Sequence, residues 1–411
     1  MSDLRQIRLT GRATLDDRLI RQVWAVPFEP PPGTRAFTVE LSYDRSRGVL
    51  DLGCEGPGGF RGWSGGARSR YTIAPSWATP GYLPGEPEAG TWHVLLGLYR
   101  VPLDGLPYEI AVTPHDTPPP PPGPGPPPPP AEVVPAALRR GLPALDGLRW
   151  QSGELHAHTV HSDGTLTVPE LAALARAQGL DFLAVTDHNT VSHHAELPGA
   201  AARAGITLVP GQEVTTDLGH ANAFGDIGWI DFREPADAWA PVAGGRGGLL
   251  SLNHPLGADC AWRHPLTERV RTAEVWHSGW WDRTWGAPLS WAQAWRDDLV
   301  YLGGGDFHRP EENHPPGAPA TWVLAEPPER GAGGEAVVEA IRAGRTAVSA
   351  GPDGPLLLRH GEEFVVLDAD GLVLWGPEHR SVIRGDRVRL PARPGPHRLE
   401  TTRNEVMALC T

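Results

Sequence analysis

Two short segments of the chain each place two metal-binding side chains on one face of a strand. In Glu154-Leu155-His156-Ala157-His158, alternate positions of an extended chain share a face, so His156 and His158 are expected to point the same way. Asp306-Phe307-His308 repeats this spacing with a carboxylate and an imidazole. Such paired groups can hold a metal ion, and the spacing therefore predicts metal binding.

Single candidates follow other apolar runs. Asp187 and His188 end DFLAVTDH, Glu213 ends ITLVPGQE, and His254 ends LLSLNH. In parallel α/β folds, functional residues gather at the C-terminal ends of the strands, so these distant positions are expected to meet at one mouth. Each residue taken alone is better explained by a hydrogen-bonded structural role. Five strand ends that each supply an imidazole or a carboxylate favour a metal site.

The ligand types narrow the chemistry. The set combines imidazoles with carboxylates and contains no thiolate, since Cys54, Cys260 and Cys410 lie far apart. Zinc, manganese or iron suits such ligands. The set is too large for one ion, so we expect two or three divalent ions with Glu213 or Asp306 as a bridge. A multinuclear centre activates water and stabilises an anionic leaving group, which predicts a metal-dependent hydrolase.

The elements that position these residues alternate between strand and helix. Strands are expected at 181–187, 206–213, 248–254, 272–277 and 299–306. TVPELAALARAQG (167–179) predicts a helix, with Thr167 and Glu170 as a capping box, and a second helix is expected at 334–344. This alternation indicates a parallel sheet or barrel.

The remaining sequence suggests four parts. Residues 1–116 contain short alternating runs separated by Gly and Pro turns and favour a β-sandwich-like domain. The proline run at 117–135 predicts a semi-rigid linker, with partner binding as the alternative. Residues 136–354 form the predicted catalytic domain, and 355–411 a small β-rich C-terminal appendage.

Composition excludes several functions. The chain has no lysine, which excludes a P-loop and Schiff-base chemistry. Its formal net charge of −13 makes a nucleic acid polymer an unlikely partner. The first residues lack an apolar segment and no run is long enough for a membrane span, so we expect a cytoplasmic protein. The sequence does not indicate an oligomeric state.

The ordered motifs resemble the PHP (polymerase and histidinol phosphatase) superfamily. The resemblance covers about residues 150–352. It rests on an ordered series of motifs: His-x-His followed by Asp163, then TDHN, a strand-end Glu, NHP and GGDFH. Five further segments resemble the CehA/McbA-type metal-dependent phosphoesterases. They are 212–222 and 340–352, with DLG (51–53), FRGWSGG (60–66) and ATPGYLPG (78–85) before the predicted catalytic domain. The resemblance implies a distorted (β/α)7 barrel with a di- or trinuclear site.

The resemblance also implies three ligand sets. The first metal would be held by His156, His158, Glu213 and Asp306, the second by Glu213, His254 and His220, and the third by Asp163, His188 and His308. Some PHP enzymes have His where Asp163 stands. Some members have a metal-binding His at the position of His277, which otherwise is expected to contact substrate.

Four residues are candidates for roles other than metal ligation. Asp187 is expected to orient a ligand or hold a proton, and His277 to contact substrate. Arg283 and Arg309 could each bind a phosphate through two hydrogen bonds, although an exposed structural arginine is the plainer interpretation. Tryptophans between Trp262 and Trp295 either wall a pocket or pack in the core.

The sequence therefore predicts a phosphoesterase. A metal-bridging hydroxide would hydrolyse a small phosphomonoester or phosphodiester. One alternative is a metallohydrolase of a carbamate or carboxyl ester, which a dry Trp-lined pocket would favour. Another is a non-catalytic, metal-stabilised binding protein, against which the complete ligand set argues.

Overall fold

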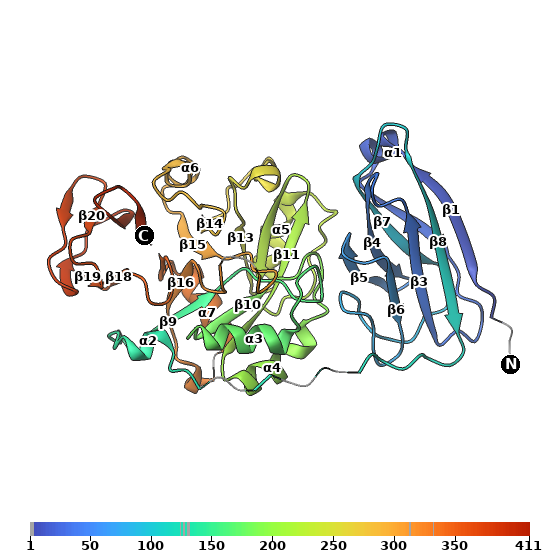
Figure 1. Cartoon of the computed structure of the whole chain (residues 1–411), viewed down its shortest axis with the longest axis horizontal. Helices are drawn as coiled ribbons and strands as arrows, with labels where there is room; N and C mark the ends of the chain where they lie inside the picture. Colours follow the sequence, from blue (N-terminus) through green and yellow to red (C-terminus); the bar gives the residue numbers. More distant parts are fainter. Residues whose placement is uncertain (1–3, 124, 126–127, 130–131, 312–313, 332) are drawn as a thin grey trace. The chain divides into compact units, whose positions relative to one another are not determined.

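The computed structural model describes residues 4–411 except 124, 126–127, 130–131, 312–313 and 332 (Figure 1). The chain divides into two compact units. The N-terminal unit comprises Met1–Pro126 with the loops Val160–Asp163 and Asp187–His193, and the C-terminal unit comprises the remaining residues. Part of the predicted linker at 117–135 lies outside the described residues.

The N-terminal unit contains two four-stranded antiparallel sheets around one core. One sheet has the order β1-β8-β3-β6 and the other β2-β7-β4-β5. The core is apolar and aromatic, and Phe37 packs edge-on against Trp92 with ring centroids 4.9 Å apart. The strands are β1 (Ile7–Ala13), β2 (Val23–Phe28), β3 (Ala36–Tyr43), β4 (Val49–Gly56), β5 (Gly59–Gly65), β6 (Arg70–Ile73), β7 (Trp92–Arg100) and β8 (Leu106–His115).

The sequence pattern gave no indication of the short helix α1 (Leu15–Ile20) in this unit. Its capping box explains it, because the Thr14 side chain accepts from the Asp17 amide and the Asp17 side chain accepts from the Thr14 amide. None of the helix residues is buried, so the apolar periodicity that reveals most helices is missing here.

A sheet of 13 strands organises the C-terminal unit, in the order β15-β14-β13-β12-β11-β10-β9-β16-β17-β24-β23-β20-β21. β9, β10 and β11 run parallel, and so do β13, β14 and β15. The strands of the site-bearing half are β9 (Arg149–Glu154), β10 (Phe182–Val185), β11 (Thr207–Thr216), β12 (Gly219–Phe224), β13 (Leu249–Leu252), β14 (Thr272–His277) and β15 (Val300–Gly304). All five expected strands are present.

Helices connect and cover these strands. The helix expected at 167–179 is present as α3 (Val168–Ala177), with the predicted capping box between Thr167 and Glu170. The other helices are α2 (Ala136–Arg139), α4 (Leu197–Ala204), α5 (Ala236–Gly245), α6 (Ala287–Trp295) and α7 (Gly333–Arg342), with short 3-10 turns at His194–Glu196, Ala258–Cys260 and Pro328–Arg330. No helix in the described part of the chain has the length and apolar character needed to cross a bilayer.

The seven-fold strand–helix repeat implied by the resemblance is not confirmed, because the unit is richer in strands. A two-residue turn at 217–218 sends β12 back along β11, so two antiparallel pairings replace a helical crossover. β16 (Ala320–Ala325) also joins β9 antiparallel. The fold is therefore a mixed α/β arrangement.

The C-terminal residues are more closely integrated than an appendage. β17 (Thr346–Ser349) pairs with the last strand, β24 (Val406–Cys410), and β23 (His397–Glu400), β20 (Val373–Trp375) and β21 (Arg380–Val382) extend the main sheet from there. β18 (Leu356–His360), β19 (Glu363–Leu367) and β22 (Arg387–Pro391) form a separate three-stranded sheet. Both share one apolar core with Trp150 and Trp322.

Candidate metal centre

The two sequence pairs with alternate spacing lie side by side just beyond the ends of β9 and β15. The His158 amide donates to the Phe307 carbonyl at 2.8 Å, and the Phe307 amide donates to the His156 carbonyl at 3.1 Å. This short parallel bridge joins Ala157 to Phe307. It sets His156 and His158 against Asp306 and His308, as the spacing predicted.

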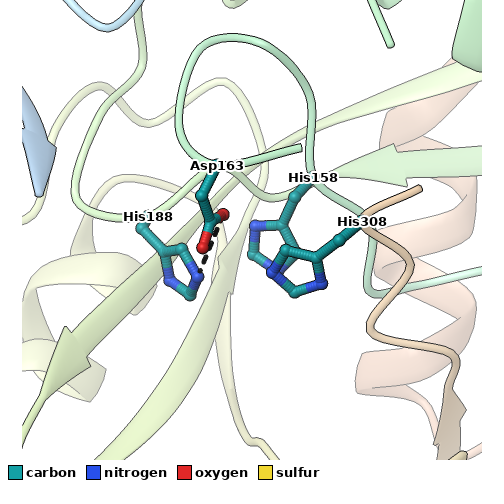
Figure 2. Close-up of side chains that lie close together, drawn as sticks. All are labelled: His158, Asp163, His188 and His308. Carbon is teal, nitrogen blue, oxygen red and sulfur yellow. Dashed lines mark ion pairs between the residues drawn. The ribbon is translucent and has the colours of Figure 1, made fainter. Parts of the chain in front are cut away.

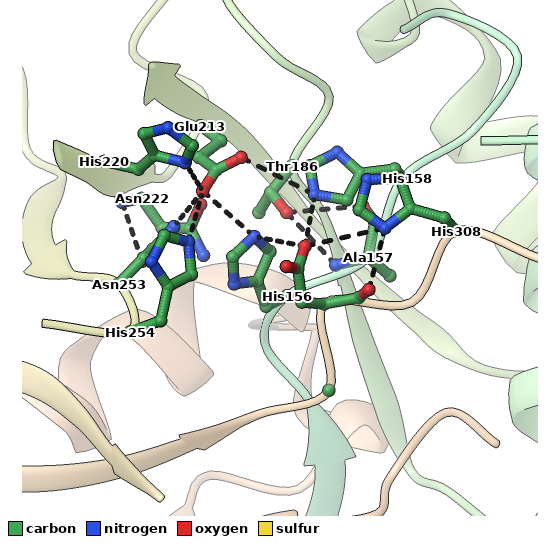
Figure 3. A network of polar contacts seen from close by, with 12 residues as sticks. His156, Ala157, His158, Thr186, Glu213, His220, Asn222, Asn253, His254 and His308 are labelled. Carbon is green, nitrogen blue, oxygen red and sulfur yellow. Dashed lines mark hydrogen bonds and ion pairs between the residues drawn. The ribbon is translucent and has the colours of Figure 1, made fainter. Parts of the chain in front are cut away.

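The first candidate ligand set converges closely (Figure 3). His156 Nε2 lies 3.2 Å from Glu213 Oε1 and 3.2 Å from Asp306 Oδ1. His158 Nε2 lies 3.0 Å from Asp306 Oδ1 and 3.6 Å from Glu213 Oε2. His156, His158 and Glu213 are fully buried, whereas Asp306 is partly exposed.

Glu213 also faces the second candidate set. The turn after β11 brings His220 on β12 opposite Thr215, and His220 Nδ1 lies 3.1 Å from Glu213 Oε1. His254, just after β13, places its Nε2 3.4 Å from the same oxygen. Asn253 Nδ2 donates to Oε1 at 2.8 Å and fixes the carboxylate. Glu213 thus stands between the two histidine groups, as expected of a bridging ligand.

These separations are also those expected of ligands that share a metal ion. Two ligand atoms about 2.1 Å from one tetrahedral ion lie roughly 3.4 Å apart, close to the 3.2 Å between His156 Nε2 and each of the two carboxylate oxygens. Among the described residues, this buried Nε2 has no hydrogen-bond partner. A native structure seldom leaves such an atom unsatisfied, so the residues fit a bound cation.

Hydrogen bonds at the far side of each ring fix which nitrogen can bind a metal. His156 Nδ1 donates to Glu274 Oε1 at 2.8 Å, and His308 Nδ1 donates to the Asp306 carbonyl at 2.8 Å. Their Nε2 atoms are then unprotonated and able to coordinate. His277 is held the other way, because its Nδ1 accepts from the Gly279 amide at 3.0 Å. The neutral ring therefore carries its hydrogen on Nε2.

The charged groups of the centre shift one another's pKa values. Burial lowers the pKa of His156, but Glu274, Asp306 and Glu213 raise it well above its usual value. Burial raises the pKa of Asp306, but His156, His158 and His277 hold it well below its usual range. The carboxylates therefore remain anionic and draw positive charge into the site, either protons or metal ions.

Asp163 and His188, predicted for a third metal, belong to loops of the N-terminal unit. His188 Nε2 lies 3.5 Å from Asp163 Oδ1, and both side chains are partly exposed. Figure 2 draws this pair with His158 and His308, whose rings stack with centroids 4.2 Å apart. The third ligand set stays a prediction.

The predicted non-metal residues lie in different surroundings. Asp187 is buried, accepts from Ser162 Oγ at 2.6 Å and lies 3.2 Å from His193 Nδ1, which suits a positioning role. His277 Nε2 lies 3.5 Å from Asp306 Oδ2 and so borders the centre.

The two arginines lie in different surroundings. The Arg283 guanidinium binds Glu405 and the Val406 carbonyl and packs over Trp276, which leaves it poorly placed for phosphate. Arg309 is exposed, directly after His308. Among the tryptophans, Trp276 and Trp280 are buried in the core and Trp281 is strongly exposed.

Two buried glutamates in the site were not predicted. Glu154 Oε1 accepts from the amides of Leu155 and His156, each at 2.9 Å, and Gly305 at 2.8 Å, and Oε2 accepts from the Gly317 amide at 2.8 Å. Glu274 contacts His156 and accepts from the His254 amide at 3.0 Å. For Glu274 the available signal was a carboxylate within the mostly apolar run TAEVWH, which is rare without a partner.

Comparison with known proteins identifies the domain. Residues 154–253 match the PHP domain family, and this range includes every predicted ligand from His156 to His220. The chain carries a PHP domain. The predicted superfamily is thus confirmed, whereas the CehA/McbA type stays a prediction.

Two relatives are similar to part of this chain. One is a 5'-3' exoribonuclease of Haemophilus influenzae, 42% identical over 64 residues, which are 16% of this chain and 23% of that protein. The other is a 3',5'-nucleoside bisphosphate phosphatase of Chromobacterium violaceum, 40% identical over 106 residues, which are 26% of this chain and 36% of that protein. The chain thus spans well under two thirds of either relative.

A solved structure is also similar. It is a two-domain protein from Bacteroides vulgatus that contains a predicted PHP-like metal-dependent phosphoesterase. The TM-score is 0.42 at 18% identity, covering 66% of this chain and 97% of that chain.

Proposed function

We propose that the chain is a metal-dependent phosphoesterase that hydrolyses a small phosphomonoester or phosphodiester. The PHP domain points to a metal-dependent hydrolase. Of the two relatives, one is named an exoribonuclease and the other a nucleoside bisphosphate phosphatase, and both names denote cleavage of phosphoesters. They therefore support phosphorus, rather than a carbamate carbon, as the reacting centre.

One observation carries the proposal. His156 Nε2 is buried, faces carboxylate oxygens of Glu213 and Asp306 at 3.2 Å, and forms no hydrogen bond within the described structure. A buried imidazole nitrogen between two anionic oxygens favours a cation, and a metal ion there would replace any proton on the nitrogen. We assign one ion to His156, His158, Glu213 and Asp306, and a second to Glu213, His220 and His254. The third ligand set, Asp163, His188 and His308, stays a prediction of the sequence.

Divalent zinc, manganese or iron would activate water and neutralise charge on the phosphoryl oxygens. The chain's own residues would do the rest. The Nε2–H of His277 is a hydrogen-bond donor beside Asp306, and we assign it to a substrate oxygen rather than to a metal. Asp187 would hold the His188 loop through Ser162. Arg309 would bind the phosphate from the exposed rim.

Sequence segments near Glu213 and at 340–352 favour the CehA/McbA type, and we propose that assignment as well. We further propose a cytoplasmic location, since small phosphoesters of nucleotides are intracellular compounds. The acidic net charge favours small substrates over a nucleic acid polymer.

A hydrolysis panel tests the function. Full-length protein, stripped with chelator and reloaded with Mn²⁺ or Zn²⁺, is assayed on a phosphomonoester, a phosphodiester, a 3',5'-bisphosphorylated nucleoside and an aryl carbamate. We expect metal-dependent turnover of a phosphoester, lost in His156→Ala and Asp306→Ala and retained in the control His379→Ala, which lies outside the centre. Turnover of the carbamate alone, or no metal-dependent turnover, would overturn the proposal.

A further inference from the structure

A buried carboxylate beside the metal centre touches two of the candidate ligands. Glu274 lies in the middle of β14 and is 2% exposed. Its Oε1 accepts from His156 Nδ1 at 2.8 Å, and its Oε2 accepts from the His254 amide at 3.0 Å. Both oxygens are therefore engaged on the side of the ligands that faces away from Glu213.

The contact with His156 determines what that ring can do. Because Glu274 takes the hydrogen on Nδ1, the lone pair of His156 is on Nε2, the atom that faces Glu213 and Asp306. An anionic partner also makes an imidazole a stronger metal ligand and fixes the orientation of its ring. Both oxygens of Glu274 accept hydrogen bonds, as a carboxylate does.

The contact with His254 acts on the backbone. His254 has a φ of +28°, a conformation that side chains other than glycine seldom adopt. Such a conformation persists only where the surroundings enforce it. The bond from its amide to Glu274 provides that constraint, and it sets the ring of His254 towards Glu213 Oε1.

The neighbouring strand leaves room for this arrangement. A Cβ atom on Gly304 would lie 2.2 Å from Glu274 Oε1 and 3.0 Å from the Cβ of His156. Only glycine at this position allows Glu274 to reach the ring. The lack of a side chain at Gly304 is therefore required for the contact between Glu274 and His156.

We propose that Glu274 is the positioning residue of the binuclear centre, which fixes the coordinating tautomer of His156 and the strained backbone of His254 at once. This inference rests on the proposed metal site. Glu274 would then influence the binding of both ions, because His156 belongs to the first ligand set and His254 to the second.

Metal affinity tests the inference. In Glu274→Gln, the amide oxygen can still accept from His156, but the anion is lost and the amide group now faces the His254 N–H. We expect calorimetric titration of metal-free protein with Mn²⁺ to show binding about 10- to 100-fold weaker than wild type. Glu400→Gln is the matched control, because Glu400 is also buried and paired, with Arg398, but lies away from the centre. Wild-type affinity in Glu274→Gln would overturn the inference.

A second measurement needs no variant of Glu274. Nitrogen NMR of histidine-labelled wild-type protein, with the signals of His156 identified by their loss in His156→Asn, reports which ring nitrogen is protonated. We expect a protonated Nδ1, with Nε2 shifting when Zn²⁺ is added. An unprotonated Nδ1, or a Zn²⁺-dependent shift at Nδ1 in place of Nε2, would overturn the inference even if Glu274→Gln fails to fold.

The two proposals fail separately. Wild-type protein that binds Mn²⁺ but hydrolyses no phosphoester would overturn the function and leave the role of Glu274 intact. Active wild-type protein whose Glu274→Gln variant binds Mn²⁺ normally would overturn the role of Glu274 alone.

Discussion

Replacing Glu213 by glutamine is the most direct perturbation of the centre. Oε1 of this buried carboxylate lies 3.1 Å from His220 Nδ1, 3.2 Å from His156 Nε2 and 3.4 Å from His254 Nε2. Glutamine has nearly the same shape. With its oxygen at the Oε1 position it keeps the bond from Asn253, so the variant is expected to fold. What it removes is the negative charge between the two histidine groups.

The loss of metal binding follows from that charge. A charged group contributes about 1.5–3 kcal/mol to each contact it makes, and Glu213 would contact two ions. The expected cost is therefore about 3 kcal/mol or more, which is roughly a 100-fold or larger rise in Kd. If the carboxylate is the bridge, the binding stoichiometry of the purified variant should also fall by at least one ion.

Calorimetric titration of chelator-stripped protein with Mn²⁺, together with elemental analysis, measures both quantities. The exposed Glu268→Gln provides the control for a simple change of charge. Unchanged stoichiometry and affinity in Glu213→Gln would show that the carboxylate does not ligate metal. The reasoning from the 3.1–3.4 Å separations would then be wrong.

Three further predictions concern stability and packing. Saturating Mn²⁺ at about 1,000 times its Kd should stabilise the fold by about 4 kcal/mol, which chelator removes; an unfolding midpoint insensitive to metal would contradict this. Gly304→Ala should weaken Mn²⁺ binding and lower the free energy of unfolding by about 1–3 kcal/mol, because the new Cβ meets Glu274. Denaturant titration measures this loss. Gly361→Ala is the comparison, because its new Cβ meets no atom but its positive φ strains the backbone, so the two variants separate crowding from strain. Burial raises the pKa of Asp181 to about 6 from 3.8. Ionisation of this group therefore disfavours the folded state, so wild type should lose about 3 kcal/mol relative to Asp181→Asn as pH rises from below 4 to above 6. Urea unfolding from pH 4 to pH 8 measures that difference, and a pH-independent gap would refute it.

The sequence allowed the grouping of the principal candidate residues to be predicted because their signal is local. Alternation in His-x-His and in Asp-Phe-His defines one face, and the structure places these faces together through a bridge between Ala157 and Phe307. Glu274 could not be assigned in the same way. Its partner His156 is 118 positions away, and nothing near Glu274 in the sequence indicates that contact.

The environment of Arg283 shows the same limit. As a cation after a strand that ends in the site, it was a reasonable phosphate ligand, but Glu405 lies 122 positions further along and occupies its guanidinium. The orientation of His277 depends on one amide, that of Gly279, which has no sequence signature. Long-range pairing explains the fold differences too, since the bond network of β17 with β24 incorporates the C-terminal strands into the main sheet.

The four amides gathered by Glu154 bear on how the protein is synthesised. Two of them belong to Gly305 and Gly317, 151 and 163 positions further along the chain. On the ribosome, the His156 segment emerges long before these partners and before Asp306. The nascent chain therefore has no completed ion site until the strands beyond position 300 have docked. Metal binding at the proposed site would then follow the docking of these strands, and it would report that the two distant segments of the chain have come together.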